Sequence, residues 1–207
     1  MSVLSRALMW QRTDTIGTEQ ALLNDRSGLH ARGVSCSAEP VPWSCRYELY
    51  TDDTWATARF EVTAEGAGFL RTVRLERAAG RWRVTASEQG DLDATLVAAG
   101  RARAGMPGTE DPSSLAGALD VDLGYSPLTN TLPVRRLRLT ESQPGTSHVV
   151  DVAWVLLPGL EVLSSRQTYT ALGDGRVRFA SGSFTAELLI DANGYVTRYP
   201  GLAERVA

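Results

Sequence analysis

Apolar and polar residues alternate along much of the chain with a period of two, which is typical of β-strands that have one buried face. In residues 55–64, for example, Ala56, Ala58, Phe60 and Val62 fall on one face. Patterns of this kind predict strands at residues 7–12, 18–23, 29–36, 45–51, 55–64, 69–77, 81–85, 160–170, 176–181, 184–190 and 195–199. Residues 149–157 are apolar at nearly every position, which predicts a strand covered on both faces.

Residues 87–118 interrupt this pattern and are expected to be irregular. Asp91 is a candidate N-cap for a short helix over 92–99, with Gly100 at its end. Residues 104–114 are rich in Gly, Pro and Asp, so they predict a long loop, which is either a mobile surface segment or a functional lid. Near the C-terminus, Asn193-Gly194 predicts a tight hairpin turn with a residue at positive φ.

The patterns together predict an all-β protein. We expect a strongly curved antiparallel sheet or a half-open barrel of about ten to twelve strands, with one or two short helices. Because strands lie on both sides of the irregular segment, two β lobes would fit the same pattern equally well. The 207 residues are the length of one ordinary domain, so a single domain over residues 1–207 is expected, with the irregular segment at 87–118 inside it.

The amino-acid composition bears on which partners the protein binds and on where in the cell it is located. The 24 acidic and 21 basic residues are mixed along the chain and give a net charge of −3, which argues against a nucleic-acid partner. The first 30 residues hold no apolar run long enough for a signal peptide or a membrane helix, so a cytoplasmic location without an integral membrane segment is expected. In reducing cytosol, Cys36 and Cys45 are expected to be free thiols, although neighbouring strands would permit a disulfide.

The common catalytic motifs are absent from the sequence. It contains no Gly-x-Ser-x-Gly elbow, no phosphate-binding or dinucleotide-binding glycine loop and no Cys-x-x-Cys pair. His30 and His148 are the only histidines, which excludes a His-rich metal site. We therefore expect no cofactor or metal, and a binding protein rather than an enzyme.

Residues 119–139 carry the most distinctive polar pattern. Asp120 and Asp122 would share one face of an extended backbone. Thr129-Asn130-Thr131 favours a turn or cap, and residues 133–139 alternate as a strand. In that strand Arg135 lies on the apolar face, so we expect it to be buried and paired with Asp120 or Asp122.

This stretch, LDVDLGYSPLTNTLPVRRLRL, resembles the LDVDL…TPFTNTLPIRRL signature of the bacterial putative glycolipid-binding family. Weaker similarity covers most of the chain and includes Gln167 and Tyr169. The sequence departs from the family pattern at Ala118, Ser126 and Leu128, where Cys, Thr and Phe are usual. The resemblance implies a fold similar to that of lipid and lipoprotein carriers.

The resemblance also implies a function: an apolar cavity would hold an acyl chain, and polar residues at its mouth would hold the head group of a lipid or glycolipid. The candidate ligand-binding residues are Asp120, Asp122, Asn130, Thr131, Arg135, Arg136, Gln167 and Tyr169. A structural interpretation stays open, in which these residues form only a turn and a salt-bridge network.

Two other functions also remain open. A hydrolase of a lipid-like substrate would use Asp120 or Asp122 as base and Arg135 or Arg136 to stabilise charge. A scaffold protein would instead bind a partner along a sheet edge. A cavity of roughly 300 Å³ or more would favour ligand binding.

Overall fold

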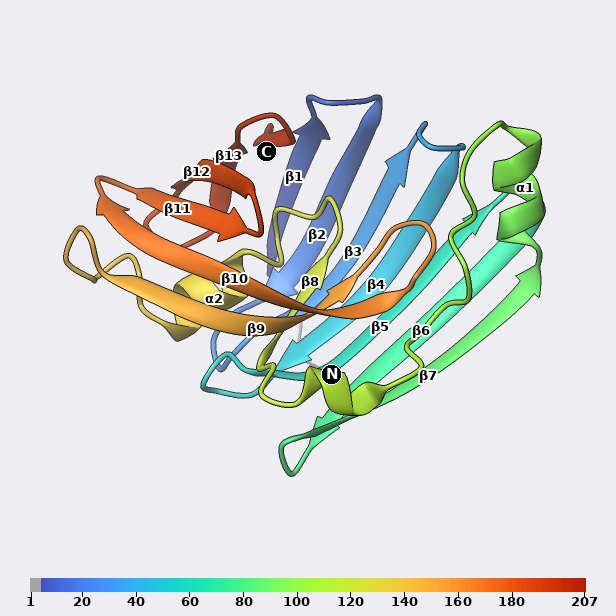
Figure 1. Ribbon diagram of the computed structural model, residues 1–207. Coiled ribbons are helices and arrows are strands. Elements are labelled where there is room, and N and C mark those ends of the chain that lie inside the picture. Colours follow the sequence, from blue (N-terminus) through green and yellow to red (C-terminus); the bar gives the residue numbers. More distant parts are fainter. Residues whose placement is uncertain (1–4) are drawn as a thin grey trace.

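One large sheet runs through the computed structural model, which describes residues 5–207 (Figure 1). The strands are β1 (Arg6–Arg12), β2 (Gly17–Asn24), β3 (His30–Ser37), β4 (Trp43–Thr51), β5 (Thr57–Gly66), β6 (Phe69–Ala78), β7 (Arg81–Gly90), β8 (Asp120–Leu123), β9 (Ser147–Val155), β10 (Val162–Gly173), β11 (Arg176–Ser181), β12 (Phe184–Ile190), β13 (Val196–Tyr199) and β14 (Ala203–Arg205). The predicted all-β fold with a curved, half-open sheet is confirmed. Within the described residues the sheet has 14 strands rather than ten to twelve, because β8 and β14 add short strands.

The strand order is β7-β6-β5-β4-β3-β2-β1-β14-β13-β12-β11-β10-β9-β8. Strand β14 pairs with both β1 and β13, so the last strand joins the N-terminal and C-terminal halves of the sheet. All neighbouring strands are antiparallel except β8 and β9, which are parallel. The sheet is therefore mixed, which corrects the expectation of a purely antiparallel one.

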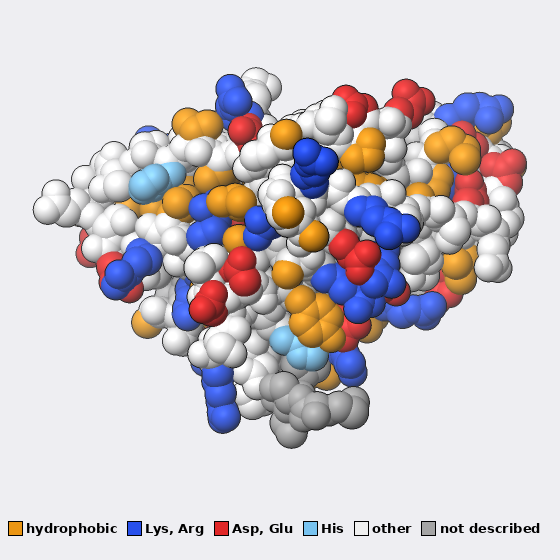
Figure 2. Space-filling model, turned by 90° about the horizontal axis from the view of Figure 1, so that it is seen from below, with side chains coloured by type: hydrophobic (Ala, Val, Ile, Leu, Met, Phe, Trp, Pro, Cys, Tyr) orange, Lys and Arg blue, Asp and Glu red, His pale blue; other side chains and the backbone are white. Residues whose placement is uncertain are grey.

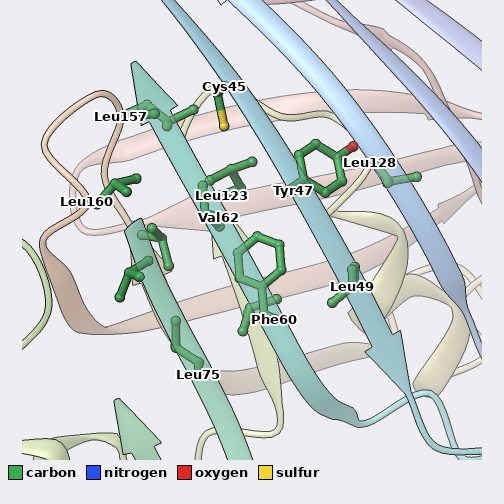
Figure 3. Packing of buried hydrophobic residues seen from close by; sticks show 14 of the residues in the cluster. Cys45, Tyr47, Leu49, Phe60, Val62, Leu75, Leu123, Leu128, Leu157 and Leu160 are labelled. Atoms are coloured by element: carbon green, nitrogen blue, oxygen red, sulfur yellow. The ribbon is translucent and has the colours of Figure 1, made fainter. Parts of the chain in front are cut away.

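Two hydrophobic cores lie on the two sides of β9. The larger core joins the inner faces of β1–β7 to Val121 and Leu123 of β8 and to Ala153 and Val155 of β9. In Figure 3, side chains from β4, β5 and β6 point toward Leu123, Leu128, Leu157 and Leu160. The second core contains Val150 and Val152 of β9 and the inner faces of β10–β13. The apolar run at 149–157 is thus largely covered on both faces, as predicted.

Three short helical segments accompany the sheet: α1 (Leu92–Ala98), the 3₁₀ helix η1 (Pro112–Leu115) and α2 (Thr131–Arg136). Asp91 is the N-cap of α1, as the sequence predicted, and its carboxylate accepts a hydrogen bond from Ala94 N. The strand expected at 133–139 is wrong, because residues 131–136 are helical. Pro133 fits there since it lies in the first turn, where its missing N–H would have no intrahelical partner.

The irregular segment begins later than predicted, since β7 continues to Gly90. The loop after α1 is attached to the C-terminal half of the sheet through Gly108. Its N–H donates to Leu160 O, and its carbonyl accepts from Val162 N, each at 2.8 Å. Leu115 of η1 is fully buried in the larger core.

Cys36 and Cys45 are free thiols, as expected. They lie on the neighbouring strands β3 and β4, but Cys45 is buried on the inner face and Cys36 is exposed on the outer one. Among residues 5–207, no helix has the length and apolar character needed to cross a bilayer. Basic and acidic side chains are interleaved on the face shown in Figure 2.

Candidate functional site

A pocket of about 400 Å³ opens on the C-terminal half of the sheet. Its walls come from β9–β13, from the end of β8 and from the turn that follows β8. The apolar part is formed by Trp154, Leu156, Leu157, Phe179, Phe184 and Tyr199. The polar part is formed by Asp122, Ser126, Asn130, Gln167 and Ser181. The volume lies within the range of small-molecule sites.

Asp122, Gln167 and Asn130 are linked by a chain of hydrogen bonds that passes through Tyr169, which lies behind them. Asn130 Nδ2 donates to the Tyr169 hydroxyl (2.9 Å), which donates in turn to Gln167 Oε1 (3.2 Å). Gln167 Nε2 then donates to Asp122 Oδ2 (2.6 Å). Every donor in the chain points toward Asp122, so the network favours a negative charge on that carboxylate.

The electrostatics of this polar end depend on Asp122. Burial raises the pKa of Asp122 to about 6, against the hydrogen bonds from Gln167 and Thr129, which lower it. At neutral pH the carboxylate is therefore mostly ionised. Burial and the charge of Asp122 raise the pKa of Tyr169 well above its usual value, so its hydroxyl stays neutral.

Strand alternation explains how the chain builds this end of the pocket. In β8, Val121 and Leu123 point into the larger core, which turns Asp120 and Asp122 to the other side. The chain then turns at Tyr125, whose φ of 68° is left-handed, and Ser126 N donates to Leu123 O (3.0 Å). This turn carries the backbone over the sheet to Asn130, the N-cap residue of α2.

Aromatic side chains form the opposite wall and the mouth. The Phe179 ring lies 6.1 Å from those of Phe184 and Tyr199, and 5.3 Å from Tyr169 (centroid distances). Phe184 is 50% exposed, and Tyr125 is 45% exposed across the opening. An apolar ligand that entered here would bury ring surface that is otherwise exposed to water.

The structure places Asp120 and Arg136 outside the pocket lining, in a buried ion pair. Arg136 Nη2 and Nε donate to the two carboxylate oxygens of Asp120, at 2.5 and 3.1 Å. The Asp120 side chain is 0% exposed and that of Arg136 is 15% exposed. Burial raises the pKa of Asp120, opposed by the bonds from Arg136. This two-point contact holds α2 against β8.

The expectation that Arg135 is buried and paired with Asp120 or Asp122 is wrong. Arg135 is half-buried, its guanidinium lies 4.4 Å from the centre of the Trp55 ring, and its Nη1 donates to Asn193 O (2.7 Å). Because residues 131–136 form a helix, Arg136, and not Arg135, turns toward β8. Neither arginine lines the pocket that contains Asp122.

The eight predicted residues therefore divide into two groups. Asp122, Asn130 and Gln167 line the pocket, and Tyr169 contacts two of them from behind. Asp120, Arg135, Arg136 and Thr131 lie outside its lining, and Thr131 is fully buried. Asp120 and Asp122 lie on the same side of β8, but Arg136 of α2 binds Asp120, whereas Gln167 of β10 binds Asp122.

Sequence reasoning missed a buried carboxyl group beneath the pocket. Glu19 of β2 is 2% exposed, and its Oε1 accepts hydrogen bonds from the Ser126 hydroxyl (2.6 Å) and the Tyr47 hydroxyl (2.5 Å). Burial raises the pKa of Glu19 to about 7, against the bonds from Ser126 and Tyr47, which lower it. The signal was present in the alternation of β2, which places Glu19 on the buried face with Ala21 and Leu23.

A second hollow, of about 610 Å³, opens at the ends of β2–β6. Its lining includes Ile16, which is 81% exposed, and the buried Phe69. The polar side chains there include Ser44 and Glu65, which bond each other at the surface. No buried carboxylate or amide network like that of Asp122 was found among the described residues of this hollow, so the smaller pocket is the stronger candidate.

Comparisons with known proteins agree with this architecture. The model of a family described as putative glycolipid-binding matches residues 7–205. The crystal structure of a DUF1089 family protein from Pseudomonas aeruginosa is similar to this chain, with a TM-score of 0.70 and 27% sequence identity. The similarity covers 94% of this chain and 95% of that one. No curated protein matches the chain.

Proposed function

Because the chain belongs to the putative glycolipid-binding family, we propose that it binds a lipid-like molecule in the pocket between β8 and the inner face of β9–β13. The acyl or alkyl chain of the ligand lies against Trp154, Phe179 and Phe184. Its polar head lies toward Asp122, Gln167 and Asn130.

One observation carries this proposal: a single pocket combines an aromatic wall with a buried polar network. Apolar wall surface gives affinity for a hydrocarbon chain without regard to its orientation, at about 0.8 kcal/mol per buried methylene. A few convergent polar groups then fix the orientation of the ligand. Tyr169 supports this end as a positioning residue, since its hydroxyl bonds both Asn130 and Gln167.

The proposal assigns no ligand contact to Asp120, Arg136, Arg135 or Thr131, which lie outside the pocket lining. The hydrolase alternative would need an arginine in the same pocket as the carboxylate that acts as base, and Asp122 is the only carboxylate in the lining. Arg136 is instead bound to Asp120, and Arg135 is stacked on Trp55. We therefore propose binding without catalysis.

Isothermal titration calorimetry with 1-octanol and 1-decanol tests the proposal. Two additional methylenes that enter the pocket lower the dissociation constant by about fifteenfold. Native mass spectrometry of the purified protein, under conditions that retain bound lipid, identifies any natural ligand in parallel.

A substitution that fills the pocket supplies the control. Ser181 lines the pocket from β11, so Ser181→Phe should raise both dissociation constants at least tenfold. Thr185→Phe adds the same side chain at an exposed position on the neighbouring strand β12, outside the pocket lining, and should leave both unchanged. Equal affinity for the two alcohols, or equal effects of the two substitutions, would contradict binding in this pocket.

A further inference from the structure

The polar end of the pocket holds a negative charge that the protein does not balance. Asp122 is the only carboxylate in the lining, no Arg or His belongs to the lining, and no described arginine forms an ion pair with Asp122. Arg12 stacks over Tyr125, which lines the pocket, but its Nε and Nη2 groups donate to Asp14. At neutral pH the Asp122 carboxylate is therefore mostly ionised and has no counterion from the protein.

The side-chain oxygens at this end have unused capacity to accept hydrogen bonds. Each oxygen of Asp122 accepts one side-chain hydrogen bond and can accept a further one. Asn130 is 3% exposed, yet its Oδ1 has no hydrogen-bond partner among the described residues. The Ser126 hydroxyl donates its hydrogen to Glu19, so toward a ligand its oxygen can only accept. The spare N–H groups of the Asn130 and Gln167 amides are uncharged and do not offset the carboxylate.

The aromatic wall lies within electrostatic range of this carboxylate. Burial and, to a smaller extent, the charge of Asp122 raise the pKa of Tyr199. The ring of Tyr199 lies 6.1 Å from that of Phe179 (centroid distance), and both line the pocket. The faces of aromatic rings carry partial negative charge and attract cations. The carboxylate and the rings therefore favour the same kind of head group, a positively charged one.

We infer that the head group held beside Asp122 and Asn130 is a primary ammonium group, as in a long-chain amine or an amine-bearing lipid. This inference rests on the proposed function. An ammonium group donates three hydrogen bonds, accepts none and neutralises the carboxylate. A neutral head group would displace water from Asp122 and leave its charge without a counterion, which is unfavourable. An anionic head group would in addition be repelled by Asp122.

Three compounds with the same eight-carbon chain separate these chemistries. Octylamine, 1-octanol and octanoate are cationic, neutral and anionic at pH 7.5, and each is titrated calorimetrically. Physiological ionic strength screens attraction to exposed charges. Octylamine is expected to bind at least tenfold more tightly than 1-octanol, because only the ammonium group supplies a counterion to the carboxylate. Octanoate is expected to bind more weakly than 1-octanol.

Asp122→Asn tests the residue responsible. In this variant the affinity for octylamine should exceed that for 1-octanol by less than about threefold. Asp151→Asn removes a carboxylate of β9 that pairs with Arg166 outside the pocket lining, and should keep the tenfold preference. Circular dichroism melting verifies that both variants fold. Ser181→Phe, which fills the pocket, should weaken octylamine binding at least tenfold, so it locates the amine even if Asp122→Asn does not fold.

Three results would each overturn the inference. They are a preference for octylamine below tenfold in the unmodified protein, a preference that survives Asp122→Asn, and octylamine binding that Ser181→Phe does not weaken. Binding of 1-octanol in the pocket, and with it the proposed function, would remain in place. Failure of both octylamine and 1-octanol to bind would overturn the proposed function as well.

Discussion

At the scale of single residues, the neighbours Arg135 and Arg136 have different surroundings. Arg136 forms a two-point ion pair with the fully buried Asp120, while Arg135 stacks on Trp55 and bonds one backbone carbonyl. Removal of one partner from a buried pair leaves an uncompensated charge, which costs far more than removal of a partly exposed arginine.

Arg136→Met should therefore lower the free energy of unfolding at pH 7 by about 3–5 kcal/mol. Arg135→Met is the matched control and should cost about 1 kcal/mol, the scale of one cation–π contact. Urea unfolding of both variants measures the difference. Equal losses, or a larger loss for Arg135→Met, would show that the Asp120–Arg136 pair does not hold α2 in place.

The titration of Glu19 makes the free energy of unfolding depend on pH. Its pKa is about 7 in the folded protein, above its ordinary value of 4.5. Below pH 4.5 the Glu19 carboxyl group is protonated in both the folded and the unfolded states, so its titration does not lower the free energy of unfolding. Between about pH 4.5 and 7 the unfolded state ionises first, and the free energy of unfolding falls by about 3 kcal/mol.

Glu19→Gln removes this titration. The groups that face Glu19 are the Tyr47 and Ser126 hydroxyls and Cys45, with Arg12 acting at longer range. Neither Tyr47 nor Cys45 titrates between pH 4 and 8 in the folded protein, because burial raises the pKa of Tyr47 well above its usual value and that of Cys45 to about 12. As the pH rises from 4 to 8, the free energy of unfolding of the variant should therefore increase by about 3 kcal/mol relative to that of the parent. A difference that does not change with pH would mean that folding leaves the pKa of Glu19 near its ordinary value of 4.5.

At the scale of elements, the sequence predicted strands better than the short helix. Long strands carry several repeats of the two-residue alternation, and β2–β6 follow it closely. Helix α2 has only six residues, too few for a period of 3.6 to differ clearly from a period of two. Packing of Leu132 and Val134 into the two cores decides the helical outcome, and the local pattern does not contain that information.

The turn between β12 and β13 is the clearest element-level prediction. Gly194 has a φ of 81°, as the Asn-Gly pair predicted, and a Cβ atom there would lie 3.1 Å from Val134 Cγ1 of α2. Gly194→Ala should therefore destabilise the protein by about 1–3 kcal/mol from backbone strain, with added cost from the contact with α2.

Gly182→Ala is the control for this substitution. Gly182 also has positive φ, at 56°, but its Cβ position meets nothing within 4 Å. The melting temperature of Gly182→Ala should therefore fall less than that of Gly194→Ala. The reverse order would mean that the β12–β13 turn does not pack on α2 as described.

At the scale of the whole molecule, one sheet supports two cores, and only the sheet was predictable. Alternation identifies which residues are buried, but not the core into which each one points. Val152 and Ala153 illustrate this, because both are buried in β9 and they belong to different cores. That residues 1–207 form a single domain stays a prediction.

The same limit applies to the site. The family signature selected Asp122 and Asn130 together with Asp120 and Arg136, because all four lie in one stretch of sequence. In the structure, Asp122 and Asn130 face the pocket, while Asp120 and Arg136 face each other. The parallel pairing of β8 with β9 and the turn at Tyr125 determine this arrangement. Glu19 has no place in the signature and enters the site through tertiary contact with Ser126 alone.

The most direct test of the central claim is a crystal structure of the protein with octylamine. The account predicts the octyl chain between Trp154, Phe179 and Phe184, with the ammonium nitrogen within hydrogen-bond distance of Asp122 and Asn130. Octylamine bound instead in the hollow beside Ile16 and Phe69, or oriented with its nitrogen at the aromatic mouth and its tail against Asp122, would contradict the account.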